Sequence, residues 1–165
     1  MGKHCGIGLL SIYCLANNCK KAILTDIQDP QLYEIVEKNI ALNKDLLNYT
    51  QLEKIQKNWY LTGIDWLDLV QEPSKYKLLL DQSDIIFMSD LFYDESFYEI
   101  LFTIISEFFQ KKTIFISYQE RGNTDLLYCY ADKFQIQLDL VAHTQNTKHI
   151  NFESTKEIFV FQINL

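Results

Sequence analysis

The sequence is poor in the residues that cross-link a chain or interrupt its regular structure. Its 165 residues include only five glycines, two prolines and four cysteines. The cysteines form no CxxC pair and have no histidine at metal-ligand spacing, so we expect no metal site. The same pattern is typical of reduced thiols in a cytoplasmic or nuclear protein. These cysteines are Cys5, Cys14, Cys19 and Cys129.

Basic residues and long apolar runs are also scarce. Lys and Arg total 15 against 22 Asp and Glu, which gives a formal net charge of -7. Binding to a phosphate backbone needs clustered Lys and Arg, so we expect no nucleic-acid partner. The apolar run from Ile7 to Ala16 is too short to span a bilayer core of about 30 Å, and no basic segment precedes it. We therefore expect neither a membrane anchor nor a signal peptide.

The remaining composition is typical of one α/β domain covering residues 1–165. Hydrophobic residues make up 48% of the chain, enough to bury a sizeable core. Strands that alternate with helices predict a parallel sheet with helices on both faces. The last two strands have no helix between them, which predicts a terminal antiparallel hairpin. The expected helices are Ile7–Asn18, one starting at Asp29-Pro30, Phe97–Phe109 and Asp125–Phe134, and the expected strands are Lys20–Asp26, Trp59–Ile64, Ile85–Ser89, Thr113–Tyr118, Ile136–Ala142 and Glu157–Ile163. The apolar run Ile85–Ser89 predicts a buried strand.

Glycines and an acid near the start form the first group of candidate site residues. In doubly wound sheets, ligands bind beyond the carboxyl ends of the strands. Gly6 and Gly8 could let the backbone approach a ligand closely, or could simply form a turn. Asp26 ends an expected strand, where its carboxylate could hold both hydroxyls of a ribose. The alternative is a helix-capping or loop acid, although Asp29 already supplies a cap.

Two further strand ends carry candidate residues. Asp65-Trp66 offers an acceptor for an exocyclic amine beside an indole that could cover an aromatic base, although Trp66 could also be ordinary core. Asp90 and Tyr93 follow the Ile85–Ser89 strand. Asp90 could instead cap the next helix, a role that Asp94 could also fill. The segment Tyr118–Arg121, after the next strand, could reach a substrate peptide.

Together these motifs resemble the seven-strand, S-adenosylmethionine-dependent methyltransferases, and in particular methyltransferase family 16, which includes protein-lysine methyltransferases. The resemblance covers nearly the whole chain and is carried by CGIGLLSIYCLA, LTD, GIDW and, most specifically, DIIFMSDLFYD. It implies a Rossmann-like methyltransferase sandwich with an antiparallel C-terminal hairpin. It also implies S-adenosyl-L-methionine as cofactor and a protein substrate, and we expect a monomer.

The resemblance also implies roles for individual residues. The implied cofactor-binding residues are Gly6, Gly8, Asp26, Asp65, Trp66 and Ser89. Asp90 and Tyr93 would be catalytic and face the substrate amine. A carboxylate alone favours the charged form of an amine, so we expect Asp90 to orient the amine while desolvation and the adjacent sulfonium lower its proton affinity.

The start of the chain departs from the family pattern. The places of the motif's acid, its next residue and its first glycine hold Gly2, Lys3 and His4. The first strand of the fold, expected between the Asp26 strand and the Asp90 strand, is absent from this sequence. We therefore expect the natural protein to carry a further N-terminal segment with that strand. The rival interpretation is a decayed, non-catalytic homologue.

Two functions from other classes stay open at this point. Gly6-x-Gly8-x-x-Ser11 with Asp26 approximates a dinucleotide fingerprint, which allows a nicotinamide-dependent oxidoreductase. That function leaves Asp65-Trp66 and Asp90 to Tyr93 unexplained. The second is a protein-interaction module that uses an aromatic-rich surface, because Phe, Trp and Tyr make up 14% of the chain.

Overall fold

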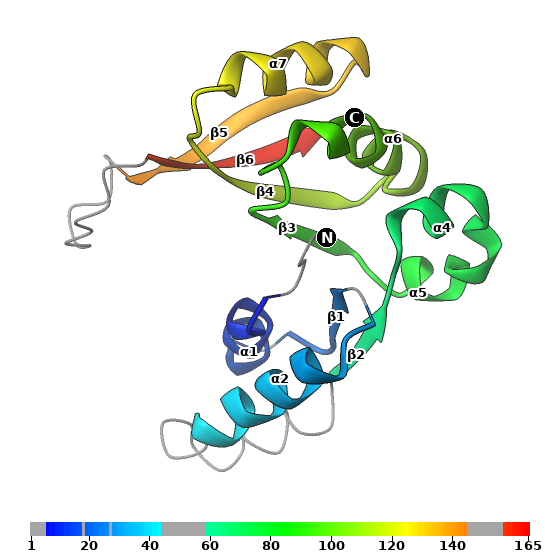
Figure 1. The fold of residues 1–165 in the computed structure, drawn as a ribbon, viewed down its shortest axis with the longest axis vertical. Helices are drawn as coiled ribbons and strands as arrows, with labels where there is room; N and C mark the ends of the chain where they lie inside the picture. The colour runs from blue at the N-terminus through cyan, green and yellow to red at the C-terminus, as the bar shows by residue number, and fades with distance from the viewer. Residues whose placement is uncertain (1–5, 18, 27, 44–58, 145–156) are drawn as a thin grey trace. The chain divides into compact units, whose positions relative to one another are not determined.

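The chain divides into two units, Met1–Asp65 and Trp66–Leu165. The computed structural model describes residues 6–17, 19–26, 28–43, 59–144 and 157–165 (Figure 1). All ten helices and strands expected from the sequence are present at or near their predicted positions. The single domain covering residues 1–165 stays a prediction.

Unit 1 consists of two parallel strands and two helices. Its elements are α1 (Leu9–Ala16), β1 (Ala22–Asp26), α2 (Pro30–Leu42) and β2 (Trp59–Gly63). The two strands pair in register from Ala22 beside Trp59 to Asp26 beside Gly63. Both strands therefore end at the same edge, as parallel pairing requires. The buried core of the unit comprises Ile12, Leu15, Ala22, Leu24, Val36 and Ile40.

Helix α2 begins as its sequence predicts. An Asp29 carboxylate oxygen accepts a hydrogen bond from the Gln31 backbone N–H at 2.9 Å, and Pro30 occupies the first turn. The loop predicted at residues 48–57, beyond this helix, lies outside the described residues.

Unit 2 contains a four-stranded sheet. Strand β3 (Ile85–Ser89) pairs in parallel with β4 (Thr113–Gln119), and β6 (Ile158–Asn164) lies between β4 and β5 (Gln137–His143), antiparallel to both. The predicted terminal hairpin is therefore confirmed. The other elements of the unit are α4 (Trp66–Gln71), η2 (Pro73–Lys75), α5 (Lys77–Asp81), η3 (Glu95–Phe97), α6 (Tyr98–Phe108) and α7 (Thr124–Lys133).

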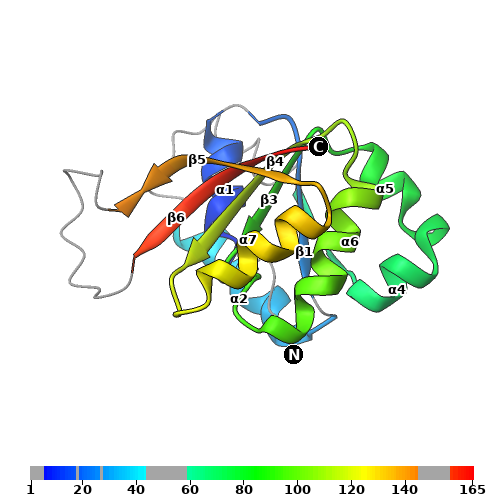
Figure 2. The ribbon, with the colours of Figure 1, turned by 90° about the horizontal axis from the view of Figure 1, so that it is seen from above.

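Helices α6 and α7 are neighbours, and each follows a strand of this sheet. Helix α7 packs against β5, and α4 packs against α6 (Figures 1 and 2). Within α6, Leu101, Phe102 and Ile105 are fully buried. The sheet and these helices thus enclose one apolar core. Every helix in the described ranges is too short or too polar to cross a membrane.

The described strands form two separate sheets, β1-β2 in unit 1 and β3-β4-β6-β5 in unit 2. In these parts of the chain, β1 is bonded to β2 alone and β3 to β4 alone. The described residues hold six strands, so the count of seven stays an expectation from the resemblance.

Strand β3 was expected to be buried, and that prediction is wrong for one of its faces. Met88 is buried, but Ile85 and Phe87 remain 53% and 46% exposed. Successive side chains of a strand point to opposite faces, so Phe87 shares its face with its partner Phe115, on which it stacks at 5.6 Å. An apolar run does not by itself distinguish a strand covered on one face from a strand covered on both.

Lys112 connects the start of β4 to α5 and the turn that follows α5. Its ammonium donates to the backbone oxygens of Leu80 and Ser83 at 2.7 and 2.6 Å. Hydrogen bonds from a charged donor contribute about 1.5–3 kcal/mol each when they are partly buried. We predict that Lys112→Met lowers the free energy of unfolding by about 3 kcal/mol in urea denaturation followed by circular dichroism. Its exposed neighbour Lys111 supplies the control, because Lys111→Met should change the free energy of unfolding by less than about 0.5 kcal/mol. Equal losses of stability in the two variants would contradict the role of Lys112.

Candidate functional site

Gly6 and Gly8 both adopt left-handed backbone conformations, with φ of 51° and 76°. Gly8 is buried, and a Cβ there would lie 3.2 Å from Leu24 Cδ2 and 3.3 Å from Val36 Cγ1. Gly8 therefore allows α1 to begin close against β1 and α2. A Cβ on Gly6 would meet nothing within 4 Å, so its backbone borders open space. Of the two glycines, Gly6 is the one with room for close approach by a ligand.

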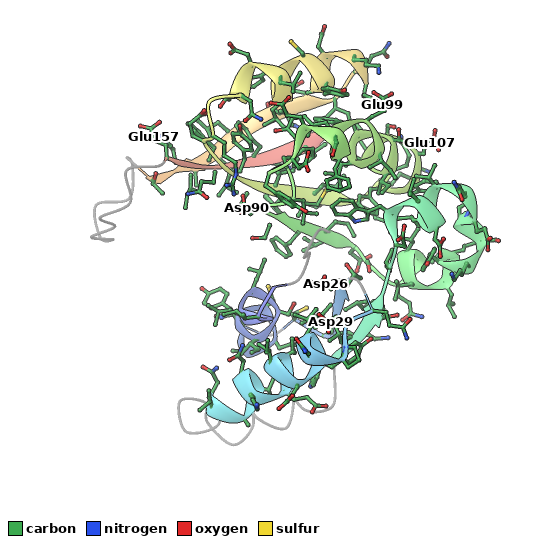
Figure 3. All side chains as sticks on the ribbon, in the orientation of Figure 1. Asp26, Asp29, Asp90, Glu99, Glu107 and Glu157 are labelled. Carbon is green, nitrogen blue, oxygen red and sulfur yellow. The ribbon has the colours of Figure 1, made fainter. Side chains whose placement is uncertain are left out.

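Asp26 ends β1 and is only 1% exposed. Its backbone oxygen accepts a hydrogen bond from the Ile64 N–H at 2.9 Å, which extends the β1-β2 ladder by one step. The helix cap belongs to Asp29, so the capping interpretation of Asp26 is wrong (Figure 3). Burial of a carboxylate is costly unless polar partners compensate it, so Asp26 is not an ordinary solvated loop acid either.

Asp65 and Trp66 lie at the boundary between the units. Asp65 is exposed after the end of β2, and Trp66 begins α4. The half-buried indole of Trp66 meets Phe97 edge to face, with ring centroids 5.3 Å apart. The ring of Tyr93 lies 6.2 Å from the same Phe97. Unit 2 thus brings Trp66 and Tyr93 to a common neighbour, Phe97, for which the sequence predicts only the start of a helix.

Ser89 and Asp90 lie where β3 leaves the sheet. The Ser89 hydroxyl oxygen is 3.1 Å from that of Ser117 on β4, and the Asp90 N–H donates to the Ser117 backbone oxygen at 2.9 Å. Asp90 has a φ of 52°, which residues other than glycine adopt infrequently. Such conformations cluster at functional sites, where surrounding contacts hold them. Ser117 was not predicted from the sequence, because only strand register brings it to Ser89.

The residues after Asp90 anchor the loop and leave Asp90 at the surface. Phe92 is buried, and its backbone oxygen accepts a hydrogen bond from the Tyr98 hydroxyl at 3.1 Å. Burial raises the pKa of Tyr98, so the hydroxyl keeps its proton and acts as donor. Asp94 accepts from the Ser96 N–H at 2.9 Å and caps η3. The interpretation of Asp90 as the cap is therefore wrong.

The two predicted catalytic side chains differ in exposure. The Asp90 side chain is 49% exposed, whereas the hydroxyl oxygen of Tyr93 is buried. Arg121, just beyond β4, donates from Nη2 to both Asp90 carboxylate oxygens at 2.9 and 2.8 Å (Asp90 is labelled in Figure 3). The sequence predicts only that Arg121 belongs to a segment that could reach a substrate peptide. Its ion pair with Asp90 was not anticipated.

The predicted site residues divide between the two units. Unit 1 carries Gly6, Gly8, Asp26 and Asp65, and unit 2 carries Trp66, Ser89, Asp90 and Tyr93. In each unit they lie at or just beyond the carboxyl ends of parallel strands, or at the start of the helix that follows a glycine turn. This is the edge where α/β sheets bind ligands. The described residues contain no cluster of three His, Cys, Asp or Glu side chains that could hold a metal ion.

Solved structures with a similar arrangement of elements include methyltransferases. Precorrin-6y C5,15-methyltransferase from Geobacter metallireducens aligns with a TM-score of 0.60 at 11% identity, covering 97% of this chain and 75% of that one. The methyltransferase domain of bacterial CtHen1-C gives 0.55 at 16% identity, with coverages of 98% and 87%. P. horikoshii TYW2 in complex with MeSAdo aligns with a TM-score of 0.53 at 14% identity. That alignment covers 96% of this chain and 53% of TYW2.

These likenesses define the class of fold, a Rossmann-like methyltransferase. A family model described as lysine methyltransferase matches residues 1–133 of the sequence. The chain therefore belongs to that family, methyltransferase family 16. S-adenosyl-L-methionine is the cofactor, and methyl transfer is the reaction class. No curated protein matches the sequence.

The residues of unit 1 fit that cofactor chemically. The open space beside Gly6 would admit a ligand close to the backbone. Asp26 and Asp65 supply carboxylates at and beyond the ends of β1 and β2, suited to a ribose diol and an exocyclic amine. Two negatively charged carboxylates also suit a cofactor that carries a positive sulfonium.

Substitution of the two glycines should separate packing from conformation. Alanine at either position incurs the left-handed backbone cost of about 1–2 kcal/mol, but at Gly8 it also crowds Leu24 and Val36. We predict that Gly8→Ala lowers the free energy of unfolding by at least about 1 kcal/mol more than Gly6→Ala. Thermal and urea unfolding of both variants measure the difference. A Gly6→Ala variant as unstable as Gly8→Ala would show that Gly6 is also packed.

Proposed function

We propose that this protein transfers a methyl group from S-adenosyl-L-methionine to the side-chain amine of a lysine in a protein substrate. The observation that carries the proposal is the state of Asp90. Its carboxylate is exposed at the carboxyl end of β3, in a left-handed conformation, and the capping role that would otherwise explain it belongs to Asp94. The description of the matching family, lysine methyltransferase, supports an amine acceptor.

The cofactor is assigned to the glycine turn and to the acids at the strand ends. In this proposal Gly6 and Gly8 border the methionine and ribose portion, and Asp26 holds the ribose hydroxyls. Asp65 accepts from the adenine amine while Trp66 covers the base. Ser89 forms part of the pocket wall. These roles agree with the left-handed glycines, the buried Asp26 and the partly exposed indole.

When bound, the cofactor supplies an electrophilic methyl group on a sulfonium. Asp90 accepts a hydrogen bond from the amine and aims its lone pair at the methyl carbon. In the transfer, the nitrogen–carbon bond would form while the carbon–sulfur bond of the cofactor would break, with its bonding pair left on sulfur. Alignment of this kind can contribute several kcal/mol to the rate, because a displacement requires the reacting atoms in line. Tyr93 shapes the acceptor site through the aromatic contact with Phe97.

The acceptor is identified by where the label goes. The protein is incubated with methyl-tritiated S-adenosyl-L-methionine and an extract of cellular protein from hypomethylated cells, and the protein fraction is hydrolysed to amino acids. We expect the label in methyllysine. Label in methylhistidine or another amino acid would contradict a lysine acceptor. Calorimetric cofactor binding without any transfer would instead favour the non-catalytic homologue.

Replacement of Asp90 should separate transfer from cofactor binding. Asp90→Asn keeps the size of the side chain but removes the charged acceptor, so we predict at least a 100-fold loss of the transfer rate, about 2.7 kcal/mol. Calorimetric titration should show S-adenosyl-L-methionine affinity within about threefold of the unchanged protein, because Asp90 is assigned to the acceptor. The matched control is Asp132→Asn, which changes an exposed carboxylate on α7. This variant should retain both the transfer rate and the cofactor affinity. Equal losses of affinity and rate at Asp90 would refute its assignment.

A further inference from the structure

Arg121 is carried by a loop that internal hydrogen bonds hold in one conformation. The Glu120 carboxylate accepts from the Gly122 backbone N–H and from the Thr124 hydroxyl. Gly122 has a φ of 87°, which only glycine adopts at little cost. The turn after β4 is therefore specified by residues on both sides of Arg121.

The same loop is tied to the segment that follows β3. The Tyr118 hydroxyl donates to Asn123 Oδ1 at 2.8 Å, and Asn123 Nδ2 donates to the Glu95 carboxylate at 3.0 Å. Tyr118 is 1% exposed, so this chain of contacts starts in the core. Two side-chain links, Asn123 to Glu95 and Arg121 to Asp90, thus join the two loops. The position of Arg121 follows from this framework and not from the ion pair alone.

The ion pair leaves Asp90 able to accept another hydrogen bond. One guanidinium nitrogen, Nη2, bridges both carboxylate oxygens, and the Arg121 and Asp90 side chains are 28% and 49% exposed. A carboxylate offers about four acceptor sites, so two remain after these bonds. Exposed ion pairs contribute little to stability, with a median of about 0–1 kcal/mol. The structural value of this pair is therefore small compared with its effect on the charge of Asp90.

The charge of Asp90 matters because only a neutral amine can attack a methyl group. The lysine ammonium has an ordinary pKa of about 10.4, and a nearby carboxylate raises it further by stabilising the charged form. A positive charge fixed on the carboxylate opposes that effect. An Asp90–Arg121 pair has no net charge. The remaining acceptor sites of the Asp90 carboxylate can still accept a hydrogen bond from the amine N–H and so orient the amine.

We propose that Arg121 is a positioning residue that cancels the charge of Asp90, so that the acceptor lysine binds there as the neutral amine. The lysine releases its proton to solvent, and its lone pair then forms the bond to the methyl carbon. This inference rests on the proposed function, because it presumes an amine acceptor at Asp90. It assigns to this chain a charge-compensating role for a residue outside the predicted catalytic pair.

Among the described residues, the charged groups on the two loops have contacts of their own. Glu120 and Glu95 are engaged within the two loops as described, and Asp94 caps η3. His143 Nε2 lies 3.3 Å from a carboxylate oxygen of Glu157, the residue before β6. Burial raises the pKa of Tyr98, on which the charge of Arg121 acts in the opposite sense, so this phenol stays neutral below pH 10. Within the described part of the chain, Arg121 is thus the cation that directly contacts the Asp90 carboxylate.

The test is the pH dependence of methyllysine formation, measured with the tritiated cofactor and the same protein extract between pH 7 and pH 10. Without Arg121 the carboxylate holds the ammonium more tightly, so the neutral amine forms only at higher pH. We predict that Arg121→Gln shifts the rising limb of the pH–rate profile to higher pH by about one unit. The rate at pH 7.5 should fall about tenfold and should recover towards the unchanged protein at pH 10. Arg121→Lys keeps the charge and should retain the original limb, even if its maximum rate falls.

Three controls make the outcome decisive. Lys133→Gln removes one positive charge from an exposed pair with Glu99, 2.6 Å apart, and should leave the pH profile unchanged. Circular dichroism and calorimetric cofactor binding check that each variant is folded, and Arg121→Met provides a second neutral replacement. An unchanged pH–rate profile in both neutral variants would overturn the role of Arg121. A faster rate at pH 7.5 in these variants would overturn it too, because it would mean that Arg121 competes with the substrate for Asp90. Absence of methyllysine with the unchanged protein would refute the proposed function itself.

Discussion

The parallel, in-register pairing of β3 with β4 is the constraint on which the acceptor side of this protein depends. The ladder runs from Ile85 beside Thr113 to Ser89 beside Ser117. It continues one step further, because the Asp90 N–H still bonds to Ser117. Both strands therefore leave the sheet at the same edge, and the loops after them meet. Without that register, Asp90 and Arg121 would not be neighbours.

Packing beneath the edge then decides which groups reach the surface. Phe92 is held in the core against Tyr98 and Phe102, at centroid distances of 5.3 Å for each. Since Phe92 is fixed inward and Asp94 is bound to the start of η3, Asp90 is held outward in its left-handed conformation. Local strain at one residue is compensated by apolar burial two residues later. The same design leaves the carboxylate both exposed and rigidly directed, as alignment of a reacting group requires.

In unit 1 the glycine turn serves two physical purposes at once. Gly8 removes a side chain that would crowd β1 and α2, whereas Gly6 borders open space. One glycine thus belongs to the fold, and the other is available to a ligand. Asp26 combines both purposes in one residue, since its backbone extends the strand ladder and its buried carboxyl group demands polar partners. Such an arrangement suits a methyltransferase, in which cofactor recognition is built onto the ends of structural strands.

Features that depend on near neighbours along the chain could be predicted from the sequence. The helices, the strands, the Asp29 cap of α2 and the terminal hairpin follow from residue spacing and turn chemistry, and the order of the motifs indicated the family. Sequence periodicity did not decide which apolar face is covered, so β3 was wrongly expected to be buried. Nor did it pair Asp90 with Arg121, 31 residues away, or place Phe97 between Trp66 and Tyr93. Those contacts depend on strand register and on how the loops pack, which only the tertiary structure decides, because residues distant in sequence meet only when the sheet aligns them.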